Sequence, residues 1–245
     1  MSAYLLGERL FGAAGAKAGI YRGAHRGSHP SRSLLVTVSE RAALDELAPR
    51  LAIAAAPGIA RLLHLGALGG GLAGVVEEEP CGRPLSAAAL PLRPDTVAQV
   101  VRQIAGVLAG VHRAGAALGG LQPEVIYARP GAGGAVLTGM APRAAILARR
   151  ALPFAQVYAP PDESWDPSGD IFSLCALASH WLSGHHPYRG LRAGAQVVAI
   201  ARGERRPWSG PSAWGELIAR GLGRRSDRPS LEELVAAFDE IEAAA

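Results

Sequence analysis

Two residue types that phosphate chemistry commonly uses, lysine and asparagine, are nearly absent from this sequence. The chain has 245 residues with one lysine, Lys17, and no asparagine. A mechanism that needs an amine must therefore use Lys17, and a mechanism that needs an asparagine ligand is excluded. Lys17 lies in a glycine-rich loop that starts at Gly12 and contains Gly15. From such a loop an amine would reach a phosphate, whereas a plain flexible hairpin is the alternative interpretation.

The cysteines and the clustered histidines do not form a set of metal ligands. Two cysteines, Cys81 and Cys175, are too few for a disulfide framework or a ligand set, which favours free thiols in a reducing compartment. His180 lies five residues before His185, so the two do not share one helix face, and His185 and His186 precede a proline. This spacing favours structural histidines, and no metal site is expected.

The glycine-rich loop must be held by strands, and the first 80 residues are predicted to be mostly β. The run 33–38 is β-branched and is the best strand signal in the chain. Ser39 is expected to cap a helix over residues 40–55. The other expected strands are 4–11 and 18–25, followed by a hairpin made of 59–66 and 71–78.

The turn-rich segment from Cys81 to Pro84 is the candidate boundary, since the signals beyond it are mainly helical. A stripe of apolar residues at helical spacing predicts a helix over 95–113. Ser230 resembles the capped start of the last helix. The further expected helices are 171–182, 193–202, 213–222 and 231–241. The sequence thus predicts an α+β chain with a small β-rich part, 1–80, and a larger helical part, 81–245.

The order of the motifs resembles the protein kinase superfamily, and most closely bacterial serine/threonine kinase domains. Leu118-Gly-Gly-Leu-Gln-Pro-Glu-Val-Ile126 is similar to the catalytic-loop motif His-Arg-Asp-Leu-Lys-Pro-Glu-Asn-Ile. Gly169-Asp-Ile-Phe-Ser-Leu174 is similar to the start of the αF helix, Ser-Asp-Ile-Tyr-Ser-Leu. The other segments that resemble the family, in the family's order, are 4–10, 20–22, 36–39, 57–63, 136–141, 158–163 and 227–230. The resemblance implies a bilobal protein-kinase-like fold.

The same resemblance implies that the catalytic positions are vacated. The third-strand lysine falls on Ser39, the catalytic base on Gly120, the metal-binding asparagine on Val125 and the metal-binding aspartate on Gly139. Mg²⁺ prefers oxygen ligands, which valine and glycine side chains do not supply. No catalytic residue is expected, and the resemblance therefore implies a pseudokinase.

A degenerate nucleotide cleft stays open as an alternative. Its candidate residues are Gly12, Gly15, Lys17, Glu77 and Glu79. The glycines of the loop are three and four residues apart, whereas those of the family are two and three residues apart. Three successive glutamates, which start at Glu77, occupy the hinge between the lobes. These acids are expected to make the cleft mouth electronegative, and no cofactor is expected. The alternative function is ATP binding, or atypical serine/threonine kinase or phosphotransferase activity, in this cleft.

Two residues match positions that hold the kinase scaffold together. Asp170 matches the aspartate that binds the backbone of the catalytic loop. Arg228 matches the arginine that pairs with the acid of the Ala-Pro-Glu motif. Pro161 stands at that acid's own position, so Asp162 or Glu163 is expected to serve in its place.

The segment that matches the activation loop, residues 141–157, contains no serine, threonine or tyrosine. Phosphorylation cannot switch this segment. Arg143, Arg149 and Arg150 make it basic, which suggests either a packed, ordered loop or a docking surface for an acidic partner.

Composition narrows the partners. The formal charge is +4 and aromatic residues make up 5% of the chain, which argues against nucleic-acid binding. No stretch approaches the ~20 apolar residues of a membrane span, and no secretory signal is evident. The sequence predicts a soluble, cytoplasmic scaffold or allosteric regulator in bacterial signalling, whose partner is an active kinase or another signalling protein. A detached module of a larger signalling system is a further alternative.

Overall fold

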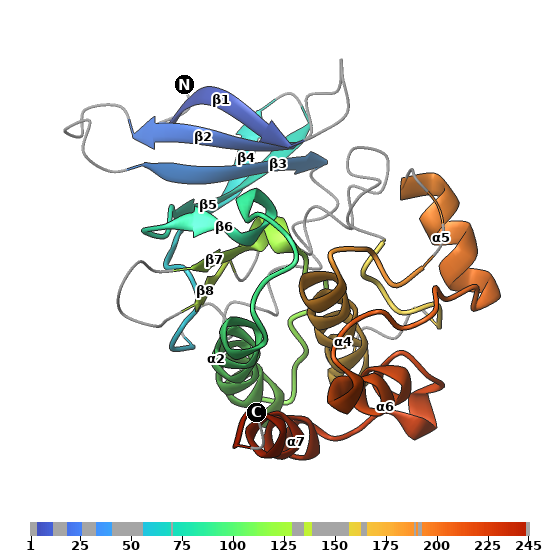
Figure 1. The fold of residues 1–245 in the computed structure, drawn as a ribbon. Helices are drawn as coiled ribbons and strands as arrows, with labels where there is room; N and C mark the ends of the chain where they lie inside the picture. The colour runs from blue at the N-terminus through green and yellow to red at the C-terminus, as the bar shows by residue number, and fades with distance from the viewer. Residues whose placement is uncertain are drawn as a thin grey trace.

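A computed structural model describes residues 4–11, 19–25, 33–40, 56–69, 71–128, 135–138, 157–162, 166–188, 190 and 193–243 of the chain. An antiparallel sheet from the N-terminal part stands above a mainly helical C-terminal part (Figure 1). This is the bilobal α+β arrangement that the motif order predicts.

The upper lobe is one antiparallel sheet with the strand order β1-β2-β3-β5-β4. Its residues alternate between two faces because successive side chains of a strand point in opposite directions. On the outer face, Leu34, Val36 and Val38 pack with Val76 in a small core. The strands are β1 (Tyr4–Phe11), β2 (Gly19–His25), β3 (Leu34–Glu40), β4 (Leu62–Gly69) and β5 (Leu72–Glu78).

The prediction that Ser39 caps a helix is wrong. Ser39 pairs with Ala73, and Glu40 pairs with Leu72, so β3 continues to Glu40. The ladder with β5 satisfies the backbone there, and this long-range pairing outweighs the local capping preference of serine. The rest of the expected helix, residues 41–55, lies outside the described residues.

The hairpin that includes β4 also starts later than predicted. Ile59 forms a parallel bridge with Leu137, and the Ala60 N–H donates to the Leu137 carbonyl at 2.6 Å. The Leu137 N–H donates to the Gly58 carbonyl at 2.8 Å. Leu137 belongs to β8 (Ala135–Leu137) in the lower lobe, so this segment ties the two lobes together instead of starting the strand.

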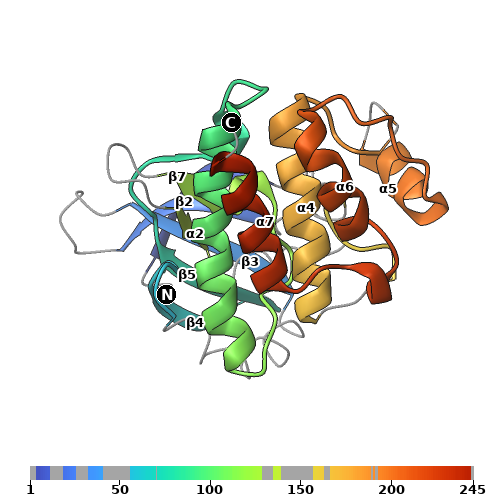
Figure 2. The same cartoon turned by 60° about the horizontal axis from the view of Figure 1, so that its bottom comes forward.

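The lower lobe is built around α4 (Pro167–Ser183), which is buried along most of its length. It packs against α2 (Pro94–Arg113) and α6 (Ser212–Gly221), while α7 (Leu231–Ala243) packs against α2 and α6 (Figure 2). The remaining helix of the described residues is α5 (Ala193–Arg202). A second sheet of the described residues joins β6 (Arg83–Pro84), β7 (Ile126–Ala128) and β8 (Ala135–Leu137).

Two close contacts fix the helices of this lobe. A side chain at Gly221 would place its Cβ 2.1 Å from the Cys175 Sγ, so α6 and α4 approach each other through this glycine. The ring of Trp214 on α6 meets Phe238 on α7 edge to face, with centroids 4.2 Å apart. Burial raises the pKa of the Cys175 thiol to about 12, which makes it an unreactive core residue.

The capped start predicted for the last helix is confirmed. The Glu233 N–H donates to Ser230 Oγ at 3.1 Å, and the Ser230 N–H donates to Glu233 Oε2 at 2.7 Å. This reciprocal pair is a capping box, which satisfies donors that the first helical turn leaves open.

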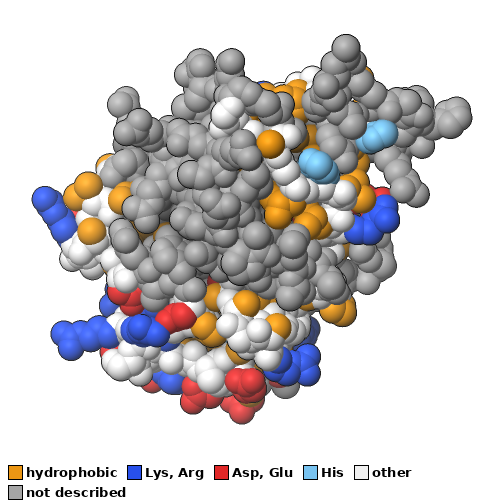
Figure 3. Space-filling model, turned by 180° about the vertical axis from the view of Figure 1, so that it is seen from behind, with side chains coloured by type: hydrophobic (Ala, Val, Ile, Leu, Met, Phe, Trp, Pro, Cys, Tyr) orange, Lys and Arg blue, Asp and Glu red, His pale blue; other side chains and the backbone are white. Residues whose placement is uncertain are grey.

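On the surface seen from behind, acidic and basic side chains lie side by side along the lower edge (Figure 3). Among the described helices, none has a stretch long and apolar enough to cross a membrane.

Candidate functional site

The candidate site is the region where the inner face of the upper sheet meets the lower lobe. The strand register places Ile20, Thr37 and Val75 in one row across β2, β3 and β5. Arg22, Leu35 and Glu77 form the next row on the same face. Thr37 and Glu77 are each only 1% exposed. This face is therefore covered, although it carries polar groups.

Tyr127 on β7 lies beneath this face. Burial raises the pKa of its phenol to about 12, and the charge of Glu79 adds to the rise. Arg22 opposes the rise and Glu77 contributes to it, so the phenol lies within reach of all three charges. At 3% exposure, Tyr127 is a large ring packed between the lobes. Sequence reasoning missed this residue, although an aromatic two positions after Val125 was the available signal.

An ion pair links β2 to the segment after β5. Arg22 Nη2 donates to Glu79 Oε1 at 2.8 Å, and its Nε donates to the two carboxylate oxygens at 3.1 and 3.0 Å. Arg22 Nη1 donates to Glu8 at 2.8 Å. The hydrogen bond and charge of Glu79 raise the pKa of Arg22, so the guanidinium stays charged.

This pairing corrects the expectation of an electronegative cleft mouth. Glu79 pairs with Arg22, and Glu78 pairs with Arg61 at 3.2 Å. Two of the three hinge carboxylates therefore have a guanidinium beside them. The third, Glu77, is buried on the inner face.

The hinge backbone is also occupied. The Glu78 N–H donates to the Arg61 carbonyl at 2.9 Å, and the Glu79 N–H donates to the Ser33 carbonyl at 3.0 Å. Pro80 follows, and proline has no backbone N–H. Residues 78–80 thus present no open backbone donor to a ring in the cleft.

The loop that matches the catalytic motif is buried and carries no acid at the base position. Gly119 and Gly120 adopt positive φ angles of 63° and 91°, which L-residues with side chains rarely adopt. Val125 is 1% exposed, and its carbonyl accepts the Thr138 N–H at 3.0 Å. Gly120 and Val125 therefore contribute backbone and packing, with no side-chain oxygen.

Other predicted site residues fall outside what is described. Ser39 pairs with Ala73 through the backbone, but its side chain is not described. Eight residues that the motifs predicted for the glycine loop, the metal position, the basic segment and the Ala-Pro-Glu region lie outside the described residues: Gly12, Gly15, Lys17, Gly139, Arg143, Arg149, Arg150 and Glu163.

Asp170 holds the loop from below. It lies in the first turn of α4, with a fully buried side chain. Its carboxylate accepts the N–H groups of Leu118 and Gly119, each at 2.8 Å. His112, in the last turn of α2, lies with its Nε2 2.9 Å from the same carboxylate. One carboxylate thus fastens the loop to two helices.

Arg228 fastens the same end of α4, through contacts on either side of Asp170 in the sequence. Its side chain is 2% exposed, and its Nη2 donates to Asp162 Oδ2 at 2.8 Å. Further donations reach Ser168 and the Gly223 carbonyl, each at 3.3 Å. The guanidinium also lies over the Phe172 ring, 5.1 Å from its centroid. Of the two acids that the sequence offered, Asp162 makes this pair.

A cluster of aromatic rings lies below the loop. The Tyr158 hydroxyl lies 2.6 Å from His180 Nδ1. His186 Nε2 donates to the Val157 carbonyl at 2.8 Å, and His186 Nδ1 accepts the Tyr188 N–H at 3.3 Å. Both ring nitrogens are satisfied only in the neutral tautomer. Burial lowers the pKa of His186 to about 4.

His186 gives a testable pH dependence. The pKa of His186 is about 4 in the folded protein, which is lower than the usual 6.5. As the pH falls, the unfolded chain therefore binds a proton at this residue before the folded protein does. The free energy of unfolding should therefore fall by roughly 1.4 kcal/mol per pH unit as pH drops through this window. His186→Gln should flatten the slope, as measured by urea unfolding at several pH values. Exposed His185→Gln is the control and should keep the wild-type slope; equal slopes in wild type and His186→Gln would contradict the assignment.

The comparisons with known proteins place the fold. No family model and no curated protein sequence matches the chain. A solved structure of Rad53 (residues 1–466), in complex with AMP-PNP, superimposes with a TM-score of 0.71 and 18% sequence identity. The match covers 95% of this chain and spans 64% of the Rad53 chain. The fold is thus the bilobal α+β fold of a kinase.

Proposed function

We propose that this chain is a catalytically inactive protein-kinase-like domain that acts by binding a protein partner in bacterial signalling. The observation that carries the proposal is the hinge. Between residues 78 and 80, two N–H groups donate to the protein's own carbonyls and the third position is a proline. A nucleobase needs such donors to be oriented in a cleft, because a buried ring nitrogen without a partner costs binding energy.

The chemistry of the lower loop supports the same proposal. Gly120 and Val125 offer no carboxylate or amide at the positions where the resemblance expects them. Losing a positioned base typically costs ~10²–10⁴ in rate. Losing metal ligands removes charge stabilisation that phosphoryl transfer depends on. Tyr127, two positions after Val125, is itself buried.

The scaffold that remains suits a binding role. Asp170 and Arg228 keep the lower lobe rigid through buried polar contacts. A rigid surface can bias the conformation of a partner only if it binds the partner's two states with different affinity. The proposed partner is an acidic protein, which fits the positive charge of the segment that contains Arg143, Arg149 and Arg150. Neither nucleic acid nor a membrane is proposed as the partner.

The second candidate is nucleotide binding with atypical phosphotransferase activity in the same cleft. It is favoured by the similar Rad53 structure, which was solved with AMP-PNP. In this candidate ATP would be held by Lys17 and the glycine loop instead of the hinge.

Thermal-shift titration separates the two candidates. The full chain is heated with ATP alone, with ATP and Mg²⁺, and with ATP and Mn²⁺. A ligand at 100 times its Kd stabilises by about 2.7 kcal/mol, which gives a clear rise in Tm. We expect no rise in Tm in any of the three titrations. The Tyr127→Ala variant, which removes the buried ring but leaves the hinge unchanged, should likewise show no rise in Tm. A metal-dependent rise together with phosphate transfer would overturn the inactive assignment.

A further inference from the structure

A second cavity lies in the lower lobe, away from the cleft between the lobes. It has a volume of about 640 Å³ and lies between α4, α6 and the segment that follows α5. That volume lies within the range of small-molecule sites. Its wall is completed where Tyr188 and Arg205 form an antiparallel bridge, and where the Arg206 N–H donates to the Pro187 carbonyl at 2.8 Å. The cavity is therefore part of the folded lobe.

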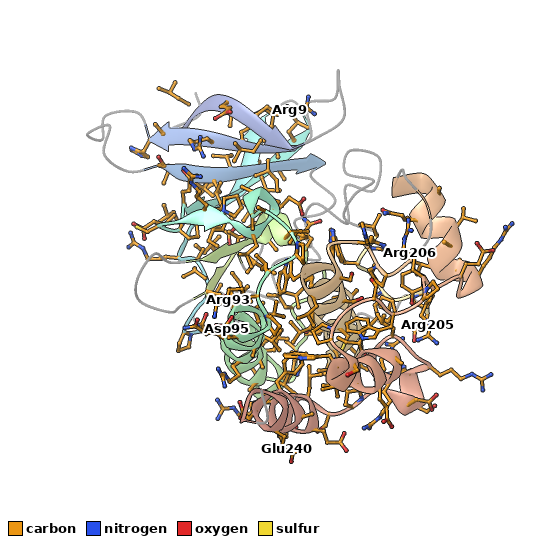
Figure 4. All side chains as sticks on the ribbon, viewed as in Figure 1. Arg9, Arg93, Asp95, Arg205, Arg206 and Glu240 are labelled. Carbon is orange, nitrogen blue, oxygen red and sulfur yellow. The ribbon has the colours of Figure 1, made fainter. Side chains whose placement is uncertain are left out.

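Two neighbouring guanidiniums give this cavity its charge. Arg205 and Arg206 line it, on the flank of the helical lobe between α5 and α6 (Figure 4). Each guanidinium donates one hydrogen bond to a backbone carbonyl. Arg205 Nη1 donates to the Ala219 carbonyl at 3.0 Å, and Arg206 Nε donates to the Tyr188 carbonyl at 3.4 Å. Among the residues that line the cavity, none is acidic, and neither arginine forms a salt bridge within the described part of the chain. Two arginines that line one cavity without a lining carboxylate favour an anion there.

His186 of the wall does not add to this charge at neutral pH. His186 lines the cavity, but burial and the nearby Arg206 lower its pKa to about 4. Its two ring nitrogens are already used by Val157 and Tyr188. Recognition of an anion therefore depends on the arginine pair, whose planar forks suit the oxygens of a phosphate.

Another part of the lining is apolar and carries a fixed aromatic ring. Trp208 Nε1 donates to the Pro211 carbonyl at 3.0 Å. A Cβ at Gly210 would come within 2.5 Å of the indole, and one at Gly215 within 3.0 Å, so glycines let the ring lie flat against the backbone. Ile218 and Leu222 of α6 continue this wall. An indole held in one orientation offers a surface on which a flat ring stacks.

We propose that this cavity, the Arg205–Trp208 pocket, binds a small phosphate monoester carried on a flat ring. The two guanidiniums bind the phosphate, and the ring lies against Trp208, Ile218 and Leu222. The pocket shares no residue with the cleft beneath the upper sheet, so it is independent of the function proposed above.

Calorimetric titration of the full chain with phenyl phosphate tests the proposal. Saturable binding is expected, and Arg205→Gln or Arg206→Gln should weaken it by about 10- to 100-fold, because each removes charge-assisted hydrogen bonds. Phenol, which lacks the charge, should not bind at the same concentration. Binding should also quench tryptophan fluorescence, and Trp208→Phe should remove the quench.

The matched control is Arg202→Gln. Arg202 ends α5, its side chain is 69% exposed, it lies 3.7 Å from Glu204, and it does not line the pocket. This variant should bind phenyl phosphate as the wild type does, and each variant should melt at the wild-type Tm. Failure of the wild type to bind at millimolar phenyl phosphate would overturn the proposal. So would equal affinity for phenol, or equal weakening by Arg202→Gln.

Discussion

Replacing Asp170 with alanine is expected to lower the free energy of unfolding by about 3–5 kcal/mol. The variant leaves the N–H groups of Leu118 and Gly119 buried without their acceptor and removes the partner of His112. A buried donor without a partner loses its hydration and gains nothing in return. Urea unfolding followed by circular dichroism measures the change, and the midpoint should move while the slope stays constant.

The control for this variant is another carboxylate on an exposed helix. Asp239 pairs with Arg102 at 2.9 Å, with side chains 51% and 36% exposed. Asp239→Ala should change the free energy of unfolding by less than about 1 kcal/mol, since water screens such pairs. Equal losses in Asp170→Ala and Asp239→Ala would show that Asp170 does not hold the loop.

Arg228→Ala is the second variant with a large expected effect, a loss of about 3–5 kcal/mol. It leaves Asp162 without its guanidinium and removes contacts to Ser168, Gly223 and the Phe172 ring. Arg228→Lys keeps the charge but has no planar fork, so it should recover only part of the loss. Thermal unfolding compares the three proteins at one pH.

An exposed arginine of the same lobe provides the comparison. Arg220 lies 3.8 Å from Glu233, and its side chain is 47% exposed. Arg220→Ala should be nearly neutral. A full recovery in Arg228→Lys would mean that charge alone stabilises this site, contrary to the role given to the fork.

The sequence predicted the elements with strong local signals. The helix expected over 95–113 is α2, from Pro94 to Arg113, because its apolar stripe has one clear period and a proline at its start. The end of β3 was missed because serine suits both a helix cap and a strand. The ladder with β5 that decides between them involves residues more than 30 positions away.

In the candidate site, the sequence predicted the missing side chains and the anchoring residues Asp170 and Arg228. Gly120 and Val125 could be read from motif order, because an absent acid is visible in the sequence. Tyr127 and the pair of Arg22 with Glu79 could not, since they depend on how β2 and β7 meet in space. The sequence also could not predict that the carbonyls of Arg61 and Ser33 accept the N–H groups of the hinge.

The occupied hinge also bears on the choice of chemical probes. A flat heterocycle that pairs an acceptor nitrogen with a backbone N–H finds no donor between residues 78 and 80. Compounds that depend on this hydrogen bond should therefore not bind this chain, even at concentrations that saturate active kinases. In a cell extract, such compounds would remove kinase activity and leave this protein untouched. That would make it possible to separate, by chemistry alone, what this chain does from what the kinases in the same extract do.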